Sequence, residues 1–319
     1  MDIRDRRGLK AAADEALTCA PDHRKLVLVS TGAAAVVSLL VSFLNLLLAE
    51  QIAGTGGLAG MGLRSVLSTV QSVLSMALSI ALPFWALGYT AAVLKLARRE
   101  QATIDVLLTG FRRFFPVLRL LLLKGVLYCA LCMVCIYVGC MVLAMTPLAL
   151  PLYELLLPLM EASSEQAMLE AFYAIDQNAL TQAMLPMLLL SGVVCIVVCI
   201  PVSYRLRMAD LRMMDEEKCG ALAAMLTSNR MMKGNCVALF KLDLSFWWFY
   251  LGELLVAVLA WCDVLLPMLG ITLPMSEEGV YFLFYALALG LQVALYAFAR
   301  NRVEVTYATV YDALLPKEQ

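Results

Sequence analysis

The chain has 319 residues, of which 62% are apolar and 15% charged, whereas soluble proteins average about 45–50% apolar and about 25% charged residues. This composition excludes a soluble globular protein, because its long uncharged stretches cannot form a hydrated surface. With 24 basic and 25 acidic residues, the net charge of −1 excludes binding to nucleic acid through bulk positive charge.

Six apolar stretches are long enough to cross a membrane. Crossing about 30 Å of hydrocarbon takes about 20 residues in an α-helix. The stretches of this length are 26–48, 65–94, 125–153, 179–204, 244–270 and 279–299. We therefore predict an all-α fold, a polytopic transmembrane helical bundle of six membrane spans with short amphipathic interfacial helices. A single integral membrane domain over residues 1–319 is expected.

The basic residues are sorted to one side of these spans. Apart from Arg64, every Lys and Arg lies at a terminus or in a loop that six spans place on the side of both termini. Because cytoplasmic segments of membrane proteins are enriched in Lys and Arg, we predict that the N- and C-termini are cytoplasmic.

Small polar side chains recur along the second span. Its serines repeat every three or four residues, so they share one face of the helix. They are Ser65, Ser68, Ser72, Ser75 and Ser79. Close helix packing explains this row, and the alternative is a polar pathway lined by Ser72, Ser75 and Gln71. Pro83 and Gly88 predict a kink further along.

Two inner loops are basic and amphipathic. In residues 95–124, Arg112 and Arg113 lie beside phenylalanines, and Pro116 is expected to end the loop before the third span. Residues 205–241 are expected to hold a helix from about Asp215 to Gly234. General anchoring explains both loops. The sharper alternative is recognition of anionic phospholipid headgroups on the cytoplasmic side, and its candidate contacts are Arg112, Arg113, Lys233 and Lys241.

The outer segment 154–178 is acidic and contains no basic residue. Ser163 with Gln166 resembles a capping box, and Met168, Leu169 and Phe172 share one helical face. We predict a short amphipathic helix on the outer membrane surface or over the bundle. It is interpreted either as a lid on helix ends or as a substrate gate.

Cysteines at 129, 132 and 135 have the spacing of a cluster ligand. Each step turns about 300° around a helix, so these thiols do not converge on one ion. Cys195 and Cys199, one turn apart, receive the same interpretation as small packing residues. We therefore expect no metal site and no cofactor.

Two acidic residues, Glu253 and Asp263, lie in the fifth span. Aromatic residues 246–250 suggest an interfacial belt, which places Glu253 just inside the inner boundary and Asp263 about 15 Å deeper. On one helix they are about 80° apart in azimuth, so they form no catalytic pair. A buried hydrogen bond and a proton or cation relay are the two interpretations of Asp263. With one histidine, His23, and no nucleophile motif, the chain is not expected to be an enzyme.

An ordered set of short motifs lies between Ile200 and Leu251. They are Ile200-Pro201, Tyr204-Arg205, Ser228-x-x-Met231-Met232-Lys233-Gly234, Leu239-Phe240 and Leu242-x-Leu244-Ser245-Phe246. The set resembles the domain-of-unknown-function family 975 (DUF975), uncharacterised multi-pass membrane proteins found mainly in Gram-positive bacteria. Weaker matches lie at Gly110-Phe111 and Thr306-Tyr307, while Val202 and Asn235 depart from the family pattern. The resemblance implies a polytopic bacterial membrane protein and brings no established activity, cofactor or catalytic residue.

We predict a non-enzymatic structural or regulatory envelope component in the bacterial cytoplasmic (plasma) membrane, with the lipid bilayer as its partner. The alternative is a transporter or permease for a lipid or small solute, with a polar path along Asp263, Glu253, Ser72, Ser75 and Gln71. Transport predicts that Asp263 shares a polar cavity with Ser72, Ser75 and Gln71. A structural role predicts a dry, packed interior.

Overall fold

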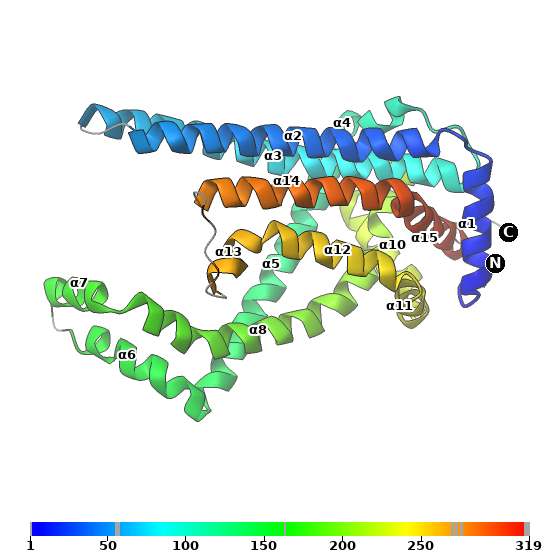
Figure 1. Ribbon diagram of the computed structural model, residues 1–319. Helices are drawn as coiled ribbons and strands as arrows, with labels where there is room; N and C mark the ends of the chain where they lie inside the picture. The colour runs from blue at the N-terminus through cyan, green and yellow to red at the C-terminus, as the bar shows by residue number, and fades with distance from the viewer. Residues whose placement is uncertain are drawn as a thin grey trace. The chain divides into compact units, whose positions relative to one another are not determined.

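A computed structural model describes residues 2–54, 58–162, 164–268, 271, 274 and 277–315 (Figure 1). The structure is 87% helical and has no strand among these residues, which confirms the all-α prediction. In chain order the helices are α1 (Arg6–Thr18), α2 (His23–Gly54), α3 (Leu58–Ala97), η1 (Ile104–Leu108), α4 (Thr109–Arg112), α5 (Phe114–Ala144), η2 (Pro147–Ala149), α6 (Leu150–Glu161), α7 (Glu165–Ala174), α8 (Gln177–Leu206), α9 (Ala209–Asp215), α10 (Ala221–Met232), α11 (Cys236–Leu244), α12 (Trp247–Ala260), α13 (Cys262–Met268), α14 (Glu277–Leu295), η3 (Tyr296–Arg300) and α15 (Asn301–Leu314).

Helix contacts divide the chain into two compact units. Unit 1 comprises residues 1–119 and 207–319, and unit 2 comprises Leu120–Leu206. In unit 1, α2 packs on α3 and α14, α12 packs on α14, and α15 packs on α1 and α3. In unit 2, α6 packs on α7 and α8. One membrane domain over residues 1–319 stays a prediction.

Five segments are long and apolar enough to cross a membrane, and a bent helix pair is a sixth if it counts as one span. The pair is α11 with α12, which meet at 74°. Five to six such segments agree with a multi-pass membrane protein. The five are His23–Leu47, Ser65–Ala97, Phe114–Ala144, Gln182–Asp215 and Gly279–Leu314.

The helix of the third predicted span has different bounds from that span. Its helix, α5, begins at Phe114 rather than Gly125. Pro116 lies in the first turn, where the missing N–H has no helical partner to lose, so it does not separate the inner loop from the span. The helix ends at Ala144 instead of Tyr153, because Thr146 is extended before Pro147, as residues before proline prefer.

The fifth predicted span is not one helix. At Trp261 the backbone leaves helical geometry, with φ −106° and ψ 10°, so α12 and α13 are separate. Glu253 and Asp263 therefore lie on two helices, and their azimuth on a common helix was wrongly predicted. Hydropathy shows no interruption here because it does not register backbone dihedrals. The sixth span also differs, since helical structure continues past Ala299 through η3 to Leu314.

The inner helix expected from Asp215 begins instead at Ala221. Glu216 and Gly220 are extended, with ψ of 115° and 150°, and they separate α9 from α10. The end of the helix agrees with the prediction. Helix α10 stops at Met232, and Gly234 has φ +85°, a left-handed conformation that glycine adopts without a steric penalty.

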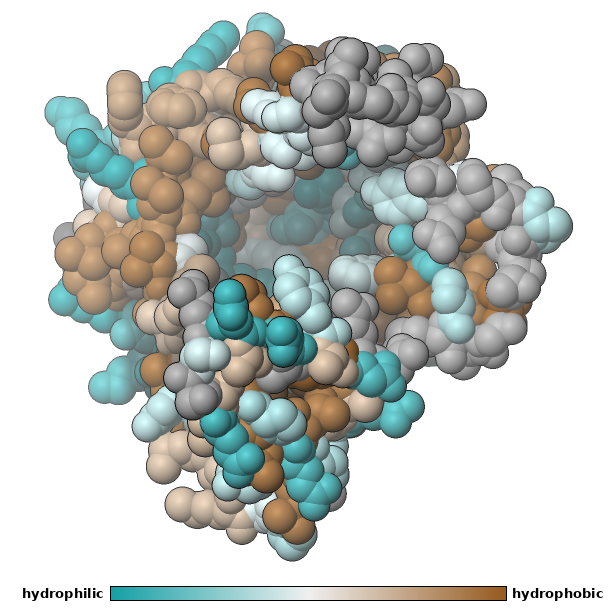
Figure 2. Space-filling view, turned by 90° about the vertical axis from the view of Figure 1, so that its left-hand side faces the viewer, coloured by the Kyte–Doolittle hydropathy of each residue, from teal (hydrophilic) through white to brown (hydrophobic). Residues whose placement is uncertain are grey.

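The acidic outer segment contains two helices, α6 and α7, where one was expected. The predicted cap Ser163 lies outside the described residues, and Ser164 caps α7 by accepting a hydrogen bond from the Ala167 N–H at 3.2 Å. Brown apolar and teal hydrophilic side chains lie together on the surface of this helix pair (Figure 2). Phe172 and Tyr173 are 61% and 82% exposed.

Burial is strongest in unit 1 at the end that holds both termini, where α1, α9, α10, α11 and α15 lie (Figure 1). We call this the basic end. Helix α1 buries Leu9 and Ala13, and α15 buries Tyr311 completely. Many span residues, including Met133 and Val126 of α5, are instead exposed and apolar. Such surfaces suit contact with lipid rather than water.

Candidate functional site

A buried ion pair joins the segments of the basic end. The Arg207 Nη1 lies 2.6 Å from Asp243 Oδ2, and the hydroxyl of Tyr307 donates to Asp243 Oδ1. The guanidinium of Arg207 also lies 3.9 Å from the centre of the Tyr307 ring. Asp243 is 8% exposed, so its charge depends on these partners rather than on water.

A second cluster surrounds Arg98, just after α3. Its guanidinium lies 2.5 Å from Asp215 of α9 and 2.8 Å from Asp312 of α15. Tyr311 donates a further hydrogen bond to Asp215 at 2.9 Å. The hydrogen bonds that Arg98 donates to Asp215 and Asp312 raise its pKa. Three helices are thus joined through one cation.

A cavity with a basic lining lies between the N-terminal segment and α11. Its volume is about 410 Å³, and it is lined by Arg4, Arg6, Gly234, Val237, Ala238 and Lys241. We call it the basic cavity. No carboxylate belongs to this lining among the described residues. Asp2 lies nearby, since its carboxylate accepts a hydrogen bond from the backbone N–H of Arg4 at 3.0 Å.

Contacts from α1 hold the two walls of the basic cavity together. Lys10 donates to the carbonyl of Ser245 at 3.0 Å and lies 4.0 Å from the centre of the Phe246 ring. Burial lowers the pKa of Lys10. The Arg6 guanidinium reaches the carbonyl of Lys241 at 3.4 Å. The basic cavity therefore lies beside the bend between α11 and α12, which these contacts hold against α1.

The predicted headgroup contacts do not share one site. Lys241 lines the basic cavity, and Lys233 is exposed one residue before Gly234. Arg112 and Arg113 line a different cavity of about 790 Å³ that also contains carboxylates such as Glu100 and Glu217. Arg113 donates to the carbonyls of Glu216 and Glu217 at 2.8 and 2.6 Å. Its guanidinium therefore provides hydrogen-bond donors for two backbone carbonyls that follow α9.

A further cavity, of about 350 Å³, lies among α2, α3 and α14. Its polar lining includes Ser30, Thr31, Ser38, Gln292 and Arg300. We call it the polar cavity. Arg300 ends a π-helical turn, η3, a feature that is common at functional sites. Its guanidinium lies 4.2 and 4.6 Å from the ring centres of Tyr89 and Tyr296.

The predicted polar pathway residues lie elsewhere. Ser72 is exposed and donates to the carbonyl of Ser68 in its own helix at 2.8 Å, while Ser75 and Gln71 are half-buried. Asp263 and Glu253 are half-buried on α13 and α12, and Glu253 Oε1 is buried without a hydrogen-bond partner among the described residues. None of the five belongs to the described lining of the polar cavity. Ser30, Thr31 and Ser38 line this cavity and were not singled out from the sequence, although their spacing places them on one side of the first predicted span.

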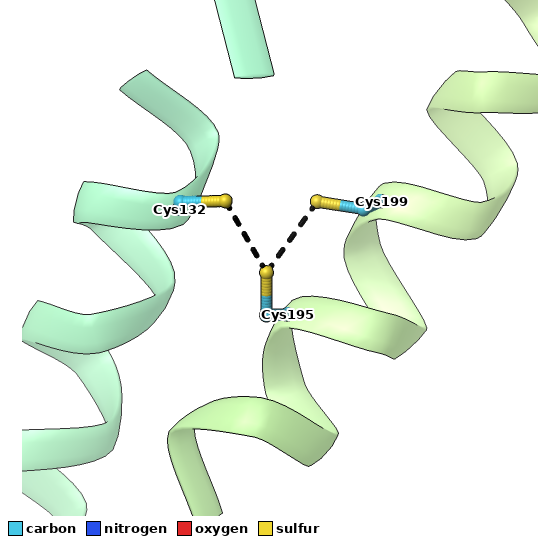
Figure 3. Close-up of side chains that lie close together, drawn as sticks. All are labelled: Cys132, Cys195 and Cys199. Carbon is cyan, nitrogen blue, oxygen red and sulfur yellow. Dashed lines mark hydrogen bonds between the residues drawn. The ribbon is translucent and has the colours of Figure 1, made fainter. Parts of the chain in front are cut away.

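Three thiols meet in unit 2 between α5 and α8 (Figure 3). Cys132 Sγ lies 3.4 Å from Cys195 Sγ, which lies 3.6 Å from Cys199 Sγ. We call these residues the thiol cluster. Spacing within one helix does not reveal it, because Cys132 and Cys195 are 63 residues apart. Cys129 is exposed and Cys135 buried, as expected for residues that step around a helix.

Comparison with known proteins identifies one family. The sequence model described as "Protein of unknown function (DUF975)" matches residues 23–292, which is most of the chain. No curated protein and no solved structure matches the chain.

Proposed function

The chain belongs to DUF975, a family of proteins of unknown function, and we propose that it is a non-enzymatic structural or regulatory protein of the bacterial plasma membrane that binds anionic phospholipid headgroups at its basic end. The observation that carries this proposal is the basic cavity, in which Arg4, Arg6 and Lys241 line one space. On this proposal the basic end faces the cytoplasm, where anionic lipids attract basic segments.

The charge and donor groups of the basic cavity suit a phosphate diester. Two guanidinium groups offer paired N–H donors that match phosphate oxygens, and Lys241 adds a compact positive charge. The carboxylate of Asp2 offsets one of the three positive charges, so the net charge at the basic cavity is +2. A phospholipid phosphate carries one negative charge, so the balance favours binding.

The apolar surroundings of the basic cavity support a lipid rather than a free anion. Val237, Phe240 and Leu244 of α11 are 65%, 51% and 62% exposed. Trp247, which begins α12, is also exposed, and tryptophan is enriched at membrane interfaces. Exposed apolar and basic side chains on one short helix are typical of a segment that lies at the headgroup level.

Replacing two of the lining cations tests the proposal. The double variant Arg6→Gln, Lys241→Gln is expected to bind phosphatidylglycerol roughly thirtyfold more weakly, because each basic residue near an anionic surface contributes about 1 kcal/mol. Native mass spectrometry of the detergent-solubilised full-length protein measures this binding, with phosphatidylcholine as the competing lipid without net charge.

The matched control removes two exposed cations from the same end, Lys218→Gln and Arg230→Gln, neither of which lines the basic cavity. Its affinity is expected to stay at the wild-type value. Equal losses in both double variants would show that net charge alone attracts the lipid. Equal wild-type affinity for the two lipids would also contradict the proposal.

The polar cavity favours a second candidate function, transport of a small solute. Ionisable residues within membrane spans often mark the path of a solute, and Arg300 lies in such a span. No carboxylate lies within 4.0 Å of its guanidinium among the described residues. A cation held between two tyrosine rings, with serine and threonine hydroxyls nearby, suits an anionic solute.

Transport predicts measurable flux in liposomes that contain the purified protein. Under imposed proton and chloride gradients, Arg300→Gln is expected to reduce the flux to that of protein-free liposomes, because the cation in the cavity is lost. Ser68→Ala on the exposed face of α3 is the control and keeps the wild-type rate. Asp263→Asn tests the relay interpretation in the same assay. Absence of wild-type flux would reject transport of these ions.

A further inference from the structure

The thiol cluster has the dimensions of a metal-binding site. A metal bound to sulfur at about 2.3 Å holds its ligands about 3.8–4.0 Å apart. The three sulfur atoms all lie within 4.8 Å of one another, with Cys195 between the other two in Figure 3. The three sulfur atoms therefore need to move by less than about 1 Å to bind one ion. A rotation about χ1 of cysteine moves its sulfur atom by more than this.

The donor atoms indicate which kind of ion the cluster would take. All three are sulfur, and no histidine or carboxylate joins them among the described residues. Thiolate and thioether ligands select soft ions such as Cu(I), whereas Mg²⁺ and Ca²⁺ require oxygen. Structural Zn²⁺ is almost always four-coordinate, so a group of three sulfur ligands, with no fourth in the described part of the chain, suits Cu(I) better.

A second pair of soft donors lies on the same two helices. Cys140 Sγ of α5 is 3.7 Å from Met187 Sδ of α8. Cys140 is eight residues from Cys132 on α5, and Met187 is eight residues from Cys195 on α8. The Cys140–Met187 pair therefore lies about 12 Å from the thiol cluster along the helices. A neutral thioether beside a thiol is a further ligand set that favours Cu(I).

The approach of α5 to α8 is set between these two groups. A Cβ at Gly139 would lie 2.2 Å from Ser191 Oγ and 3.1 Å from Ser191 Cα. Only glycine allows the helices to come this close, as small residues do in other membrane interfaces. Ser191 is 6% exposed. The spacing of the sulfur atoms therefore depends on helix packing as well as on the cysteines themselves.

We infer that Cys132, Cys195 and Cys199 form a binding site for a soft metal ion, Cu(I), within the membrane-spanning part of unit 2. Each thiol that binds as thiolate releases one proton, and the copper stays Cu(I), so no oxidant or reductant is consumed. The Cu(I) ion carries one positive charge and so compensates one thiolate, a group that is costly in an apolar environment.

Cu(I) competition titration of the full-length protein, reduced and kept free of oxygen, tests this site. Cys195→Ser is expected to weaken Cu(I) binding by at least about a hundredfold, because changes around metal ligands alone cost 10–100-fold in affinity. Cys129→Ser removes an exposed thiol from α5, the helix that carries Cys132, and is expected to leave the affinity unchanged. Equal loss in the two variants, or no binding by the wild type, would overturn the inference.

A measurement on the wild-type protein removes any dependence on how the variants fold. Cu(I) is expected to protect Cys132, Cys195 and Cys199 from alkylation, measured by peptide mass spectrometry, while Cys129 stays reactive. X-ray absorption should show sulfur-only coordination. Protection of Cys129 to the same degree, nitrogen or oxygen ligands, or a Cys132–Cys195 disulfide in place of bound copper would each contradict the site.

Discussion

Asp243→Ala is expected to lower the free energy of unfolding by about 3 kcal/mol. Removing one partner of a buried ion pair costs about 3–5 kcal/mol because the other charge stays buried. The Arg207 side chain is 30% exposed, so water recovers part of that loss and the lower end of the range applies. The hydroxyl of Tyr307 also loses its acceptor.

Urea unfolding in detergent micelles, followed by tryptophan fluorescence, measures this effect. Glu217→Ala, an exposed acid at the same end, is the control and is expected to change stability by less than about 0.5 kcal/mol. The double variant Asp243→Leu, Arg207→Met removes both charges and is expected to recover most of the stability. A double variant as unstable as Asp243→Ala would mean that the lost stability does not come from an uncompensated charge.

Gly88→Ala is expected to destabilise unit 1 by at least about 3 kcal/mol, the upper end of the usual cost of overpacking. A Cβ at Gly88 would lie 1.8 Å from the carbonyl oxygen of Leu107 and 2.6 Å from its carbonyl carbon. The obstacle is backbone, so no side-chain rotation relieves it. At Gly110, a Cβ would lie 2.0 Å from the Phe84 carbonyl oxygen, so these two glycines allow α3 to contact η1 and α4.

Gly125→Ala is the matched control, because a Cβ at that helical position meets nothing within 4 Å. Alanine is about 1 kcal/mol better than glycine in a helix, so this variant is expected to be neutral or slightly stabilised. The melting temperatures of Gly88→Ala, Gly125→Ala and the wild-type protein are measured in detergent by fluorescence-detected gel filtration and compared. Similar melting temperatures for Gly88→Ala and wild type would contradict the close approach.

The role of Gly88 illustrates what sequence patterns miss. With Pro83 it predicted a kink, which stays a prediction, and α3 is helical through both positions, from Leu58 to Ala97. Its tight contact is with Leu107, which is distant enough in sequence that no local pattern connects the two. The weak family match at Gly110-Phe111 lies at the other side of the same contact.

The basic cavity was partly predictable. Lys241 was expected near the headgroup level from its position beside the aromatic residues that begin α12. Arg4 and Arg6 were not connected to it, since Arg6 reaches Lys241 across 235 residues. In the same way, Cys195 and Cys199 were recognised as neighbours on one helix, but Cys132 joins them from another.

By itself, the sequence determined that the chain is all-α and that it belongs to DUF975, and it predicted six membrane spans where the structure has five to six segments able to cross a membrane. Hydrophobic length and short motifs are local properties, so they are readable along the chain. Only the tertiary structure decided that Trp261 separates α12 from α13, that Arg207 pairs with Asp243, and which side chains line each cavity or form the thiol cluster. These outcomes depend on the rotation and pairing of helices, which are set by packing between residues far apart in sequence.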